Sequence, residues 1–370
     1  ILYHFKLSIL DYQIIKGGFI GVDIFFVISG FIITKIIIEN KIENFSLSYF
    51  YERRIKRLLP ALLFFVLITS LLISLFDPFP SGELLTGVSS IFGISNIALF
   101  LRSKDYFATA NEFNPFMHTW SLSVEEQFYF FFPFLIWFTG FGRKKTKGAR
   151  NLLIVIIVLS IVSLISFISF YKSNTPAAYF LMTSRFWEIA VGCMVFLIHN
   201  NKNYIPKNLE KITPEIVFFG IILVMFLPIQ AAVPATIVIV LFSALLIICL
   251  NQESTLFQFL SNKKVVYIGL ISYSLYLWHW GIFAISRWTI GISWKTIPLQ
   301  LLLILCMSVI SYEVVEKRFR NISWSNKRWR SIAKGILSSF LVVTISISTG
   351  TIFKEVIYQG ERSRNRPINP

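Results

Sequence analysis

Long apolar runs, separated by short polar and basic segments, dominate the pattern of this 370-residue chain. The runs are about 17–22 residues long, the length that a helix needs to cross roughly 30 Å of hydrocarbon. Residues 152–171 and 337–353 contain no charged residue at all. In lipid, backbone polar groups must be bonded within their own segment, so continuous runs of this length predict helices and not barrel strands. The pattern therefore predicts an all-α polytopic membrane protein.

About eleven transmembrane helices are expected, the first of them truncated. The predicted spans lie near residues 1–5, 17–38, 59–76, 123–140, 151–171, 180–198, 214–230, 232–250, 265–285, 297–315 and 335–353. The moderately apolar stretch 84–101 is left out of this count because glycine, serine and asparagine interrupt it. We interpret 84–101 as re-entrant or packed on the outer surface, as broken segments are when protein buries them.

The positive charge follows the loops. The chain carries 35 Lys and Arg against 19 Asp and Glu, a net charge of +16. Basic residues gather in short segments such as 143–150 and 317–334, which marks those segments as cytoplasmic. We therefore interpret the charge as a topology signal and expect no nucleic-acid partner. The alternation of loops places the C-terminus outside the membrane, after a polar linker at 354–370.

Cysteine is scarce. Cys193, Cys249 and Cys306 lie far apart inside apolar runs, without a nearby histidine cluster. This spacing predicts neither a metal site nor a disulfide framework. The three thiols are interpreted as small core residues.

Placing an ionisable group inside a bilayer costs free energy, so each such residue is a candidate for a functional role. His4 stands at the outer end of the truncated first span, and Asp23 lies six residues inside the next span at about the same depth. A carboxylate beside an imidazole fixes its tautomer and raises its basicity, as a general base requires. The alternative for Asp23 is a buried structural hydrogen bond.

Two arginines mark the cytoplasmic side. Arg54 and Arg57 are three residues apart, so a helix presents them on one face. A pair of guanidiniums there suits a phosphorylated donor such as a nucleotide or coenzyme A. The alternative is an ordinary topology anchor.

Further polar groups occur along the later spans. Ser123 and Glu126 form a capping box that predicts a helix start, while Glu125 and His118 form a polar cluster on the outer side. His279 is aromatic-flanked and has the alternative of a packed interfacial residue. Arg185 and Glu188 are spaced i, i+3, which predicts an internal ion pair.

An ordered series of these motifs resembles the membrane-bound acyltransferase family 3. The matching stretches are 3–5 (YHF), 21–31 (GVDIFFVISGF), 50–57 (FYERRIKR), 118–129 (HTWSLSVEEQFY), 185–188 (RFWE), 272–280 (SYSLYLWHW) and 316–320 (EKRFR). The resemblance implies O-acylation of surface polysaccharides, peptidoglycan or similar acceptors. It also implies that His4 is catalytic and that Arg54 and Arg57 are needed on the cytoplasmic side. The arginine that the family places upstream of its histidine falls before Ile1.

The resemblance leads to a specific expectation. An acyl group, expected to be acetyl, moves from cytoplasmic acyl-coenzyme A to a hydroxyl of a cell-envelope glycan such as lipopolysaccharide O-antigen or peptidoglycan. The expected catalytic residues are His4, Asp23 and Glu125, with Arg54 and Arg57 at the donor. His118, Glu126 and His279 form a substrate or structural polar cluster. His4 would either take a proton from the acceptor or carry the acyl group, and no metal is expected.

The expected setting is the bacterial inner (plasma) membrane. Residues 1–334 would form a membrane acyltransferase domain, 335–353 an additional transmembrane helix, and 354–370 an external linker. Expected partners are acyl-coenzyme A, a surface or lipid-linked glycan, membrane lipids and an external SGNH-type domain, which members with such a final helix often carry. The rival hypotheses are a transporter or flippase that changes no bond, and a sensor or assembly scaffold.

Overall fold

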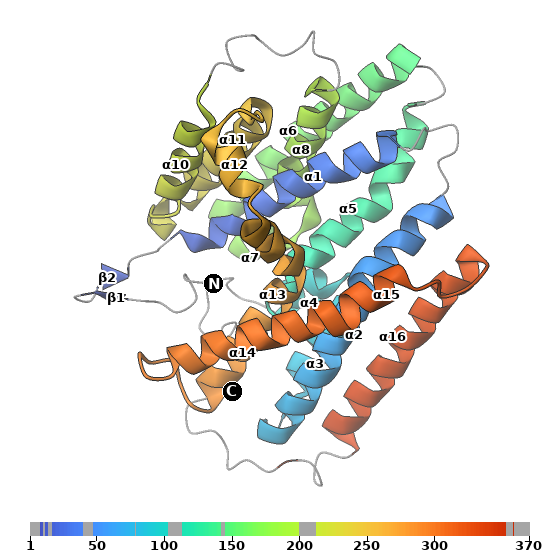
Figure 1. Cartoon of the computed structure of the whole chain (residues 1–370), viewed down its shortest axis with the longest axis vertical. Helices are drawn as coiled ribbons and strands as arrows, with labels where there is room; N and C mark the ends of the chain where they lie inside the picture. Colours follow the sequence, from blue (N-terminus) through green and yellow to red (C-terminus); the bar gives the residue numbers. More distant parts are fainter. Residues whose placement is uncertain are drawn as a thin grey trace. The chain divides into compact units, whose positions relative to one another are not determined.

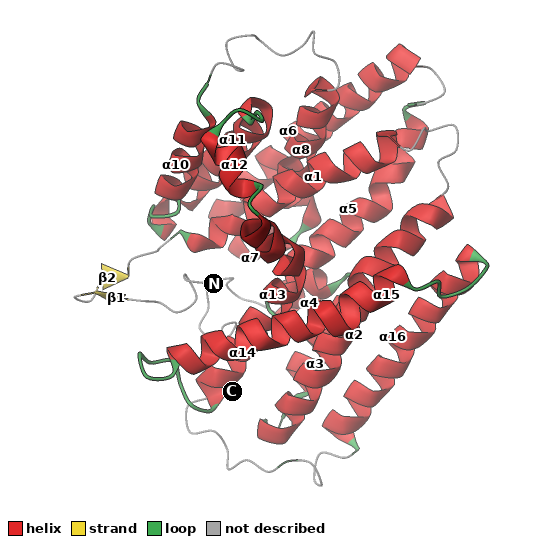
Figure 2. Ribbon diagram, viewed as in Figure 1, coloured by secondary structure: helices red, strands yellow, loops and turns green. Residues whose placement is uncertain are grey.

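The computed structural model is almost entirely helical (Figures 1 and 2). It describes residues 8–9, 12–13, 17–39, 47–77, 79–102, 113–141, 145–199, 212–352 and 358. Two strands of two residues each, β1 (Ser8–Ile9) and β2 (Tyr12–Gln13), pair antiparallel near the start of the chain. The helices group into two compact units, which are described separately below.

Unit 1 comprises residues 1–45 and 124–268. Its helices are α1 (Gly21–Glu39), α6 (Lys145–Ser173), α7 (Thr175–Phe180), α8 (Met182–His199), α10 (Pro214–Val224), α11 (Ala232–Cys249) and α12 (Thr255–Leu260), with 3-10 turns η2 (Gly18–Ile20) and η6 (Ile229–Ala231). Helix α8 lies at the centre of this unit, because it packs against α1, α6, α7 and α11.

Unit 2 comprises residues 46–123 and 269–370. Its elements are α2 (Leu47–Phe76), α3 (Ser81–Ile91), α4 (Ser95–Arg102), α14 (Ile297–Ile310), the π-helix η7 (Ser311–Glu316), α15 (Lys317–Asn321) and α16 (Arg328–Thr351). Helices α5 (Thr119–Phe138) and α13 (Lys263–Trp288) contribute residues to both units. In this unit α2 packs against α3, η7, α15 and α16.

The polytopic all-α prediction is confirmed. Within the described ranges, eight helices are long and apolar enough to cross a membrane, and each overlaps a predicted span. Those eight are Gly18–Ile38, Leu47–Phe76, Lys147–Ser173, Thr175–His199, Ile229–Cys249, Lys263–Trp288, Ile297–Asn321 and Arg328–Thr351. The predicted first span, 1–5, lies outside the described residues. The number of crossings and the side on which each loop lies stay predictions.

Two other predicted spans are helical but are not among those eight. The span predicted at 123–140 corresponds to α5, which begins four residues earlier at Thr119. The span predicted at 214–230 is shorter than expected, because α10 ends at Val224. The chain turns before Pro228, and a proline disfavours helical geometry in the residue before it.

The interrupted stretch at 84–101, which was predicted not to cross the membrane, forms two short helices. Helices α3 and α4 have 11 and 8 residues. At 1.5 Å per residue each is about 12–17 Å long, too short to cross roughly 30 Å of hydrocarbon. The break falls at Gly93, whose φ of 67° is a conformation that favours glycine.

Close backbone contact between α1 and α8 organises unit 1. A Cβ atom added to Gly30 would collide with the carbonyl oxygen of Ile189, and one added to Gly192 would collide with that of Val27. Small residues at such crossings let two membrane helices approach closely. Gly21 is different, since an added Cβ there would meet only the Met225 Cε atom at 3.8 Å. The tight contact between α1 and α8 therefore lies at Gly30 and Gly192.

Replacing Gly30 with alanine is expected to destabilise the protein by about 1–3 kcal/mol, because backbone atoms must move apart to admit the methyl group. Gly269 is the matched control, since an added Cβ in that helix position meets nothing within 4 Å. Gly269→Ala should be neutral or stabilise by up to about 1 kcal/mol. Thermal unfolding of both variants in detergent measures the difference, and equal shifts would contradict the close crossing.

Aromatic packing forms the core of unit 2. The ring of Phe65 on α2 makes edge-on contacts with Phe116, His118 and Trp278, at centroid distances of 5.7, 5.6 and 5.3 Å. Edge-to-face arrangements are a preferred geometry for aromatic pairs. This core fixes the position of His118 relative to α13.

Candidate functional site

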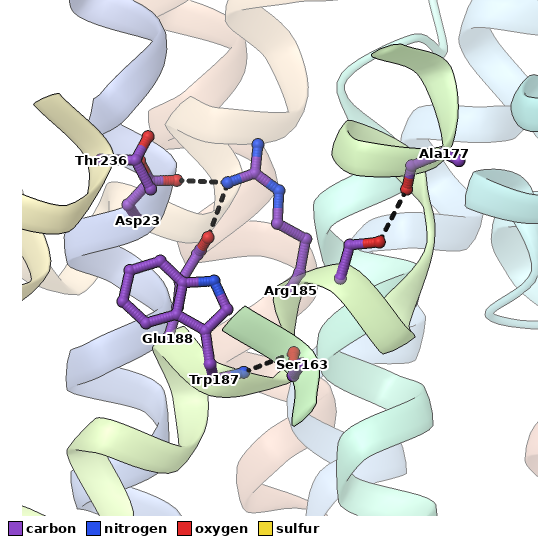
Figure 3. Close-up of polar contacts among 8 residues, drawn as sticks. Asp23, Ser163, Ala177, Arg185, Trp187, Glu188 and Thr236 are labelled. Atoms are coloured by element: carbon purple, nitrogen blue, oxygen red, sulfur yellow. Dashed lines mark hydrogen bonds and ion pairs between the residues drawn. The ribbon is translucent and has the colours of Figure 1, made fainter. Parts of the chain in front are cut away.

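A buried ion cluster joins three helices of unit 1 (Figure 3). One guanidinium nitrogen, Nη1 of Arg185, donates to Glu188 Oε1 at 2.6 Å and to Asp23 Oδ1 at 3.3 Å. Thr236 donates from its hydroxyl to the other oxygen of Asp23 at 3.0 Å. We call these four residues the ion cluster. The side chains of Arg185, Asp23 and Glu188 are only 2%, 3% and 0% exposed.

Three helices build the ion cluster. Asp23 lies in the first turn of α1, Thr236 lies on α11, and Arg185 and Glu188 are one turn apart on α8. The predicted i, i+3 ion pair of α8 is therefore confirmed. The guanidinium of Arg185 also lies over the ring of Tyr179 at 4.7 Å, which adds a cation–π contact where water is excluded.

The ion cluster changes the interpretation of Asp23. Both carboxylate oxygens of Asp23 have partners inside unit 1, which fits the structural alternative that the sequence left open. A paired buried carboxylate is strongly held, since removing one partner leaves an uncompensated charge. His4, its predicted imidazole partner, lies outside the described residues. The proposed His4–Asp23 pair stays a prediction.

The two glutamates of α5 differ in their surroundings. Glu125 is buried and accepts a hydrogen bond from the hydroxyl of Tyr129, one turn later on the same helix. Glu126 is half-buried. The capping box predicted for Ser123 and Glu126 is wrong, because α5 already begins at Thr119 and Ser123 lies within it. Ser123 instead contacts the Ser95 hydroxyl, at 2.8 Å between the two oxygens.

Two predicted histidines meet in unit 2. The rings of His118 and His279 lie 5.6 Å apart between centroids, and both side chains are buried. Tyr276 joins them, because its hydroxyl donates to the carbonyl of His118 at 2.6 Å and lies 2.7 Å from the hydroxyl of Ser121. We call His118, His279, Tyr276 and Ser121 the imidazole cluster. The structure thus brings together residues 161 positions apart in the sequence.

Hydrogen bonding defines the state of each ring. His279 Nδ1 lies 2.6 Å from the carbonyl oxygen of Tyr276. Since a carbonyl only accepts, Nδ1 carries a proton, and in the neutral ring Nε2 keeps its lone pair. Within the described part of the chain, neither ring nitrogen of His118 has a hydrogen-bond partner of good geometry. Burial, with a smaller contribution from His279, lowers the pKa of His118 well below its ordinary value, so this ring is neutral near pH 7.

A basic surface surrounds the start of α2. Arg54 is half-buried and Arg57 exposed. Helices α15 and α16, which contribute Arg320 and Arg328, pack against α2 in the same unit. Arg328 lies over the ring of Tyr49 at 5.0 Å, which fixes the start of α16 beside that of α2. We call Arg54, Arg57, Arg320 and Arg328 the basic end of unit 2.

The structure divides the predicted site residues between its two units. Asp23 and Glu125 belong to unit 1, whereas Arg54, Arg57, His118 and His279 belong to unit 2. The predicted convergence of Asp23, Glu125 and His118 around His4 therefore stays a prediction. Sequence reasoning missed Thr236 and Tyr276. Tyr276 could have been found, since it precedes His279 by three residues on one helix, but Thr236 carries no signal within its apolar run.

A comparison with known protein families shows that these clusters lie within one recognised domain. The acyltransferase domain model matches residues 2–315, which includes the ion cluster, the imidazole cluster and Arg54 and Arg57. The chain belongs to this acyltransferase family. The expectation from the ordered motifs is thereby confirmed, and the family's matched region covers most of both units.

Several curated relatives of this chain are named O-acetyltransferases. The chain is 32% identical over 376 residues to O-acetyltransferase OatA of Staphylococcus aureus (strain NCTC 8325 / PS 47), covering 93% of this chain and 59% of that protein. It is 28% identical over 387 residues to the putative peptidoglycan O-acetyltransferase YrhL of Bacillus subtilis (strain 168), covering 95% and 59%. The chain spans about three fifths of these relatives. No solved structure matches.

A third relative gives the same indication. The peptidoglycan O-acetyltransferase OatA of Listeria monocytogenes (serovar 1/2a, strain EGD-e) is 27% identical over 391 residues, covering 94% of this chain and 60% of that protein. Peptidoglycan appears in the names of the Bacillus and Listeria relatives, and what it implies for this chain is argued below.

Proposed function

We propose that this protein is a membrane O-acetyltransferase that moves an acetyl group from acetyl-coenzyme A to a hydroxyl of a cell-wall glycan. The names of its relatives favour peptidoglycan over lipopolysaccharide as the acceptor. The proposed location is the bacterial inner membrane, with the donor on the cytoplasmic side. An external SGNH-type domain that completes the transfer stays an expectation of the family resemblance.

The basic end of unit 2 carries this proposal. A donor such as acetyl-coenzyme A presents several phosphate oxygens, which arginine binds through paired, charge-assisted hydrogen bonds. Arg54 and Arg57 share one face at the start of α2, and α15 and α16 add further arginines beside them. Four arginines at one end of a helical unit offer several cations to a donor that carries several phosphate oxygens.

The chemical step is a transesterification. The acceptor oxygen forms an ester bond with the acetyl carbon, the thioester C–S bond breaks, and the acceptor's proton ends on the sulfur of coenzyme A. A general base that takes this proton contributes typically about 10²- to 10⁴-fold. His4 is proposed for that role, or for carrying the acetyl group between donor and acceptor. Glu125 and Asp23 are proposed as carboxylates that support it, and Glu126, His118 and His279 as polar groups near the acceptor.

Donor affinity tests the arginine assignment. Arg54→Ala and Arg57→Ala should each weaken acetyl-coenzyme A binding by about 10- to 100-fold, the equivalent of roughly 1.5–3 kcal/mol for a charge-assisted contact. Lysine at either position should rescue poorly, since an ammonium lacks the planar fork. Binding to the purified protein is measured alongside release of coenzyme A.

Lys56 provides the control for both variants. Its ammonium pairs with Glu52 at 2.8 Å one turn earlier on α2, and it stands two residues from Arg54 and one from Arg57, spacings at which side chains do not share a helix face. Lys56→Ala should leave donor binding near the parent value. If both lysine variants bind the donor like the parent, Arg54 and Arg57 are topology anchors only. If the parent releases no coenzyme A but moves a glycolipid across the bilayer, the transporter hypothesis is correct.

A further inference from the structure

His118 is a buried polar side chain whose ring the fold of unit 2 leaves without a hydrogen bond. The residue is 6% exposed, and among the described residues neither Nδ1 nor Nε2 has a partner of good geometry. Leaving a buried donor or acceptor unpaired destabilises a fold, so each such group needs an explanation. A ring nitrogen that bonds to substrate during the reaction provides one.

The backbone and the ring of His118 are nevertheless held in place. The carbonyl oxygen accepts from the Tyr276 hydroxyl at 2.6 Å. The ring contacts those of Phe65, Tyr276 and His279 at centroid distances of 5.6, 5.1 and 5.6 Å. Phe65 itself packs against Gly281, where an added Cβ would lie 2.8 Å from the Phe65 ring. An imidazole fixed among aromatic rings is preorganised, since it need not reorient when a substrate binds.

These surroundings keep the imidazole uncharged and make it an N–H donor. Burial lowers the pKa of His118 well below its ordinary value, so at pH 7 one ring nitrogen carries a proton and the other a lone pair. A neutral imidazole can polarise a carbonyl group and serve as the electrophile of a reaction. Where water is excluded, such a donor acts strongly on charge that develops in the transition state.

The spacing along α2 fits a coenzyme A donor that reaches His118. Phe65, which contacts His118, follows Arg57 by eight positions and Arg54 by eleven on this helix. At 1.5 Å per residue these separations are about 12 and 16 Å along the helix. The pantetheine arm of coenzyme A has about twelve bonds between its phosphate oxygen and its sulfur, the length of about four extended residues or roughly 14 Å. A donor whose phosphates bind the two arginines therefore brings its thioester to the level of Phe65.

We propose that His118 is a catalytic residue of acetyl transfer, whose imidazole N–H donates a hydrogen bond to the thioester carbonyl oxygen of the donor. This inference rests on the proposed function and leaves the general base at His4. As the acceptor oxygen bonds to the acetyl carbon, the carbonyl electron pair moves onto the carbonyl oxygen, where the N–H stabilises it. The pair returns when the C–S bond breaks. The acceptor's proton ends on the sulfur, and His118 keeps its own proton.

Replacing His118 with phenylalanine removes the donor and keeps a planar ring. His118→Phe should lower kcat by about 10²- to 10³-fold, the effect of deleting one oxyanion donor, with coenzyme A affinity near the parent value. Its Tm should equal or exceed that of the parent, because an unpaired buried polar group is removed. A lower Tm would mean that the fold itself bonds the imidazole, which would overturn the inference.

Two kinds of variant show whether the N–H group is responsible. His118→Asn and His118→Gln each restore an amide N–H, and one of them should recover at least about tenfold of the lost kcat. Trp278→Phe is the matched control, since the Trp278 ring is also buried and also contacts Phe65, at 5.3 Å. The control should keep kcat near the parent value. Equal losses of kcat in all four variants would contradict a hydrogen-bonding role.

Hydroxylamine as the acceptor separates an electrophile from a base. It attacks a thioester without first losing a proton, so it bypasses the general base but still requires a polarised carbonyl. Release of coenzyme A to hydroxylamine should therefore stay slow in His118→Phe and recover in His4→Ala. Recovery in His118→Phe would assign the base to His118 and overturn the inference.

The outcomes also separate this inference from the proposed function. If the parent releases coenzyme A and His118→Phe keeps the parental kcat, only the role of His118 is wrong. If the parent releases no coenzyme A from acetyl-coenzyme A to any acceptor, the proposed function fails and this inference fails with it.

Discussion

Replacing Arg185 with leucine should destabilise unit 1 by about 3–5 kcal/mol. The substitution would leave Asp23 and Glu188 buried together without their shared cation, since both accept from the same guanidinium nitrogen. The lost cation–π contact with Tyr179 adds to the effect. Thermal unfolding of the purified protein in detergent, compared with the parent, measures the loss.

Two further variants identify the cause of that loss. Arg330→Ala is the control for removing an arginine that lies over an aromatic ring, since Arg330 lies over Trp329 at 5.4 Å and is exposed. It should change stability by less than about 1 kcal/mol. Combining Arg185→Leu with Asp23→Asn and Glu188→Gln should recover much of the stability, because no unpaired charge remains. A triple variant as unstable as Arg185→Leu would mean that packing, not charge, holds this region.

Hydropathy predicted most of the helices because the bilayer sets their length. A run such as 152–171 must be helical along its whole length in lipid, so its position follows from composition alone. Helix boundaries were less certain. Ser123 and Glu126 match the capping-box pattern, which predicts a helix start at Ser123. In the structure a turn at 115–118 leads into α5, which begins at Thr119, and Ser123 contacts Ser95. Local patterns could not predict that contact, because it joins residues 28 positions apart.

In the candidate site, too, the sequence predicted contacts within one helix but not contacts between helices. The ion pair of Arg185 and Glu188 followed from helical spacing. The link from Arg185 to Asp23 did not, because the two residues are 162 positions apart and lie on different helices. Asp23 and His4 were paired by their similar predicted depth, which cannot tell which helices are neighbours. The carboxylate's contacts with Arg185 and Thr236 come only from the way that α1, α8 and α11 pack.

This difference matters for interpreting variants of Asp23. Because both of its oxygens are bonded within the ion cluster, Asp23→Asn acts on the packing of three helices as well as on any imidazole nearby. A loss of activity in that variant is therefore informative about catalysis only when stability is measured beside it. Stability must also be measured for variants of Glu125, because its carboxylate already accepts a hydrogen bond from Tyr129 on the same helix.

Replacing His4 with alanine should reduce release of coenzyme A by about 10²- to 10⁴-fold and leave donor affinity near the parent value. The reason is that a base acts on the acceptor's proton, whereas affinity comes from the arginines that bind phosphates. His199→Ala, at the exposed end of α8, is the matched control and should leave turnover unchanged.

The alternative to His4 is already defined by the structure. His118 is a neutral buried imidazole whose two nitrogens lack partners of good geometry among the described residues, and it contacts His279. If His4→Ala keeps parental turnover while His118→Ala loses it with donor affinity intact, the base belongs to the imidazole cluster. Should both variants lose turnover, acetyl transfer from the donor alone, measured by mass spectrometry of the protein without acceptor, distinguishes them. A histidine that carries the acetyl group is modified under those conditions, and one that only accepts the proton is not.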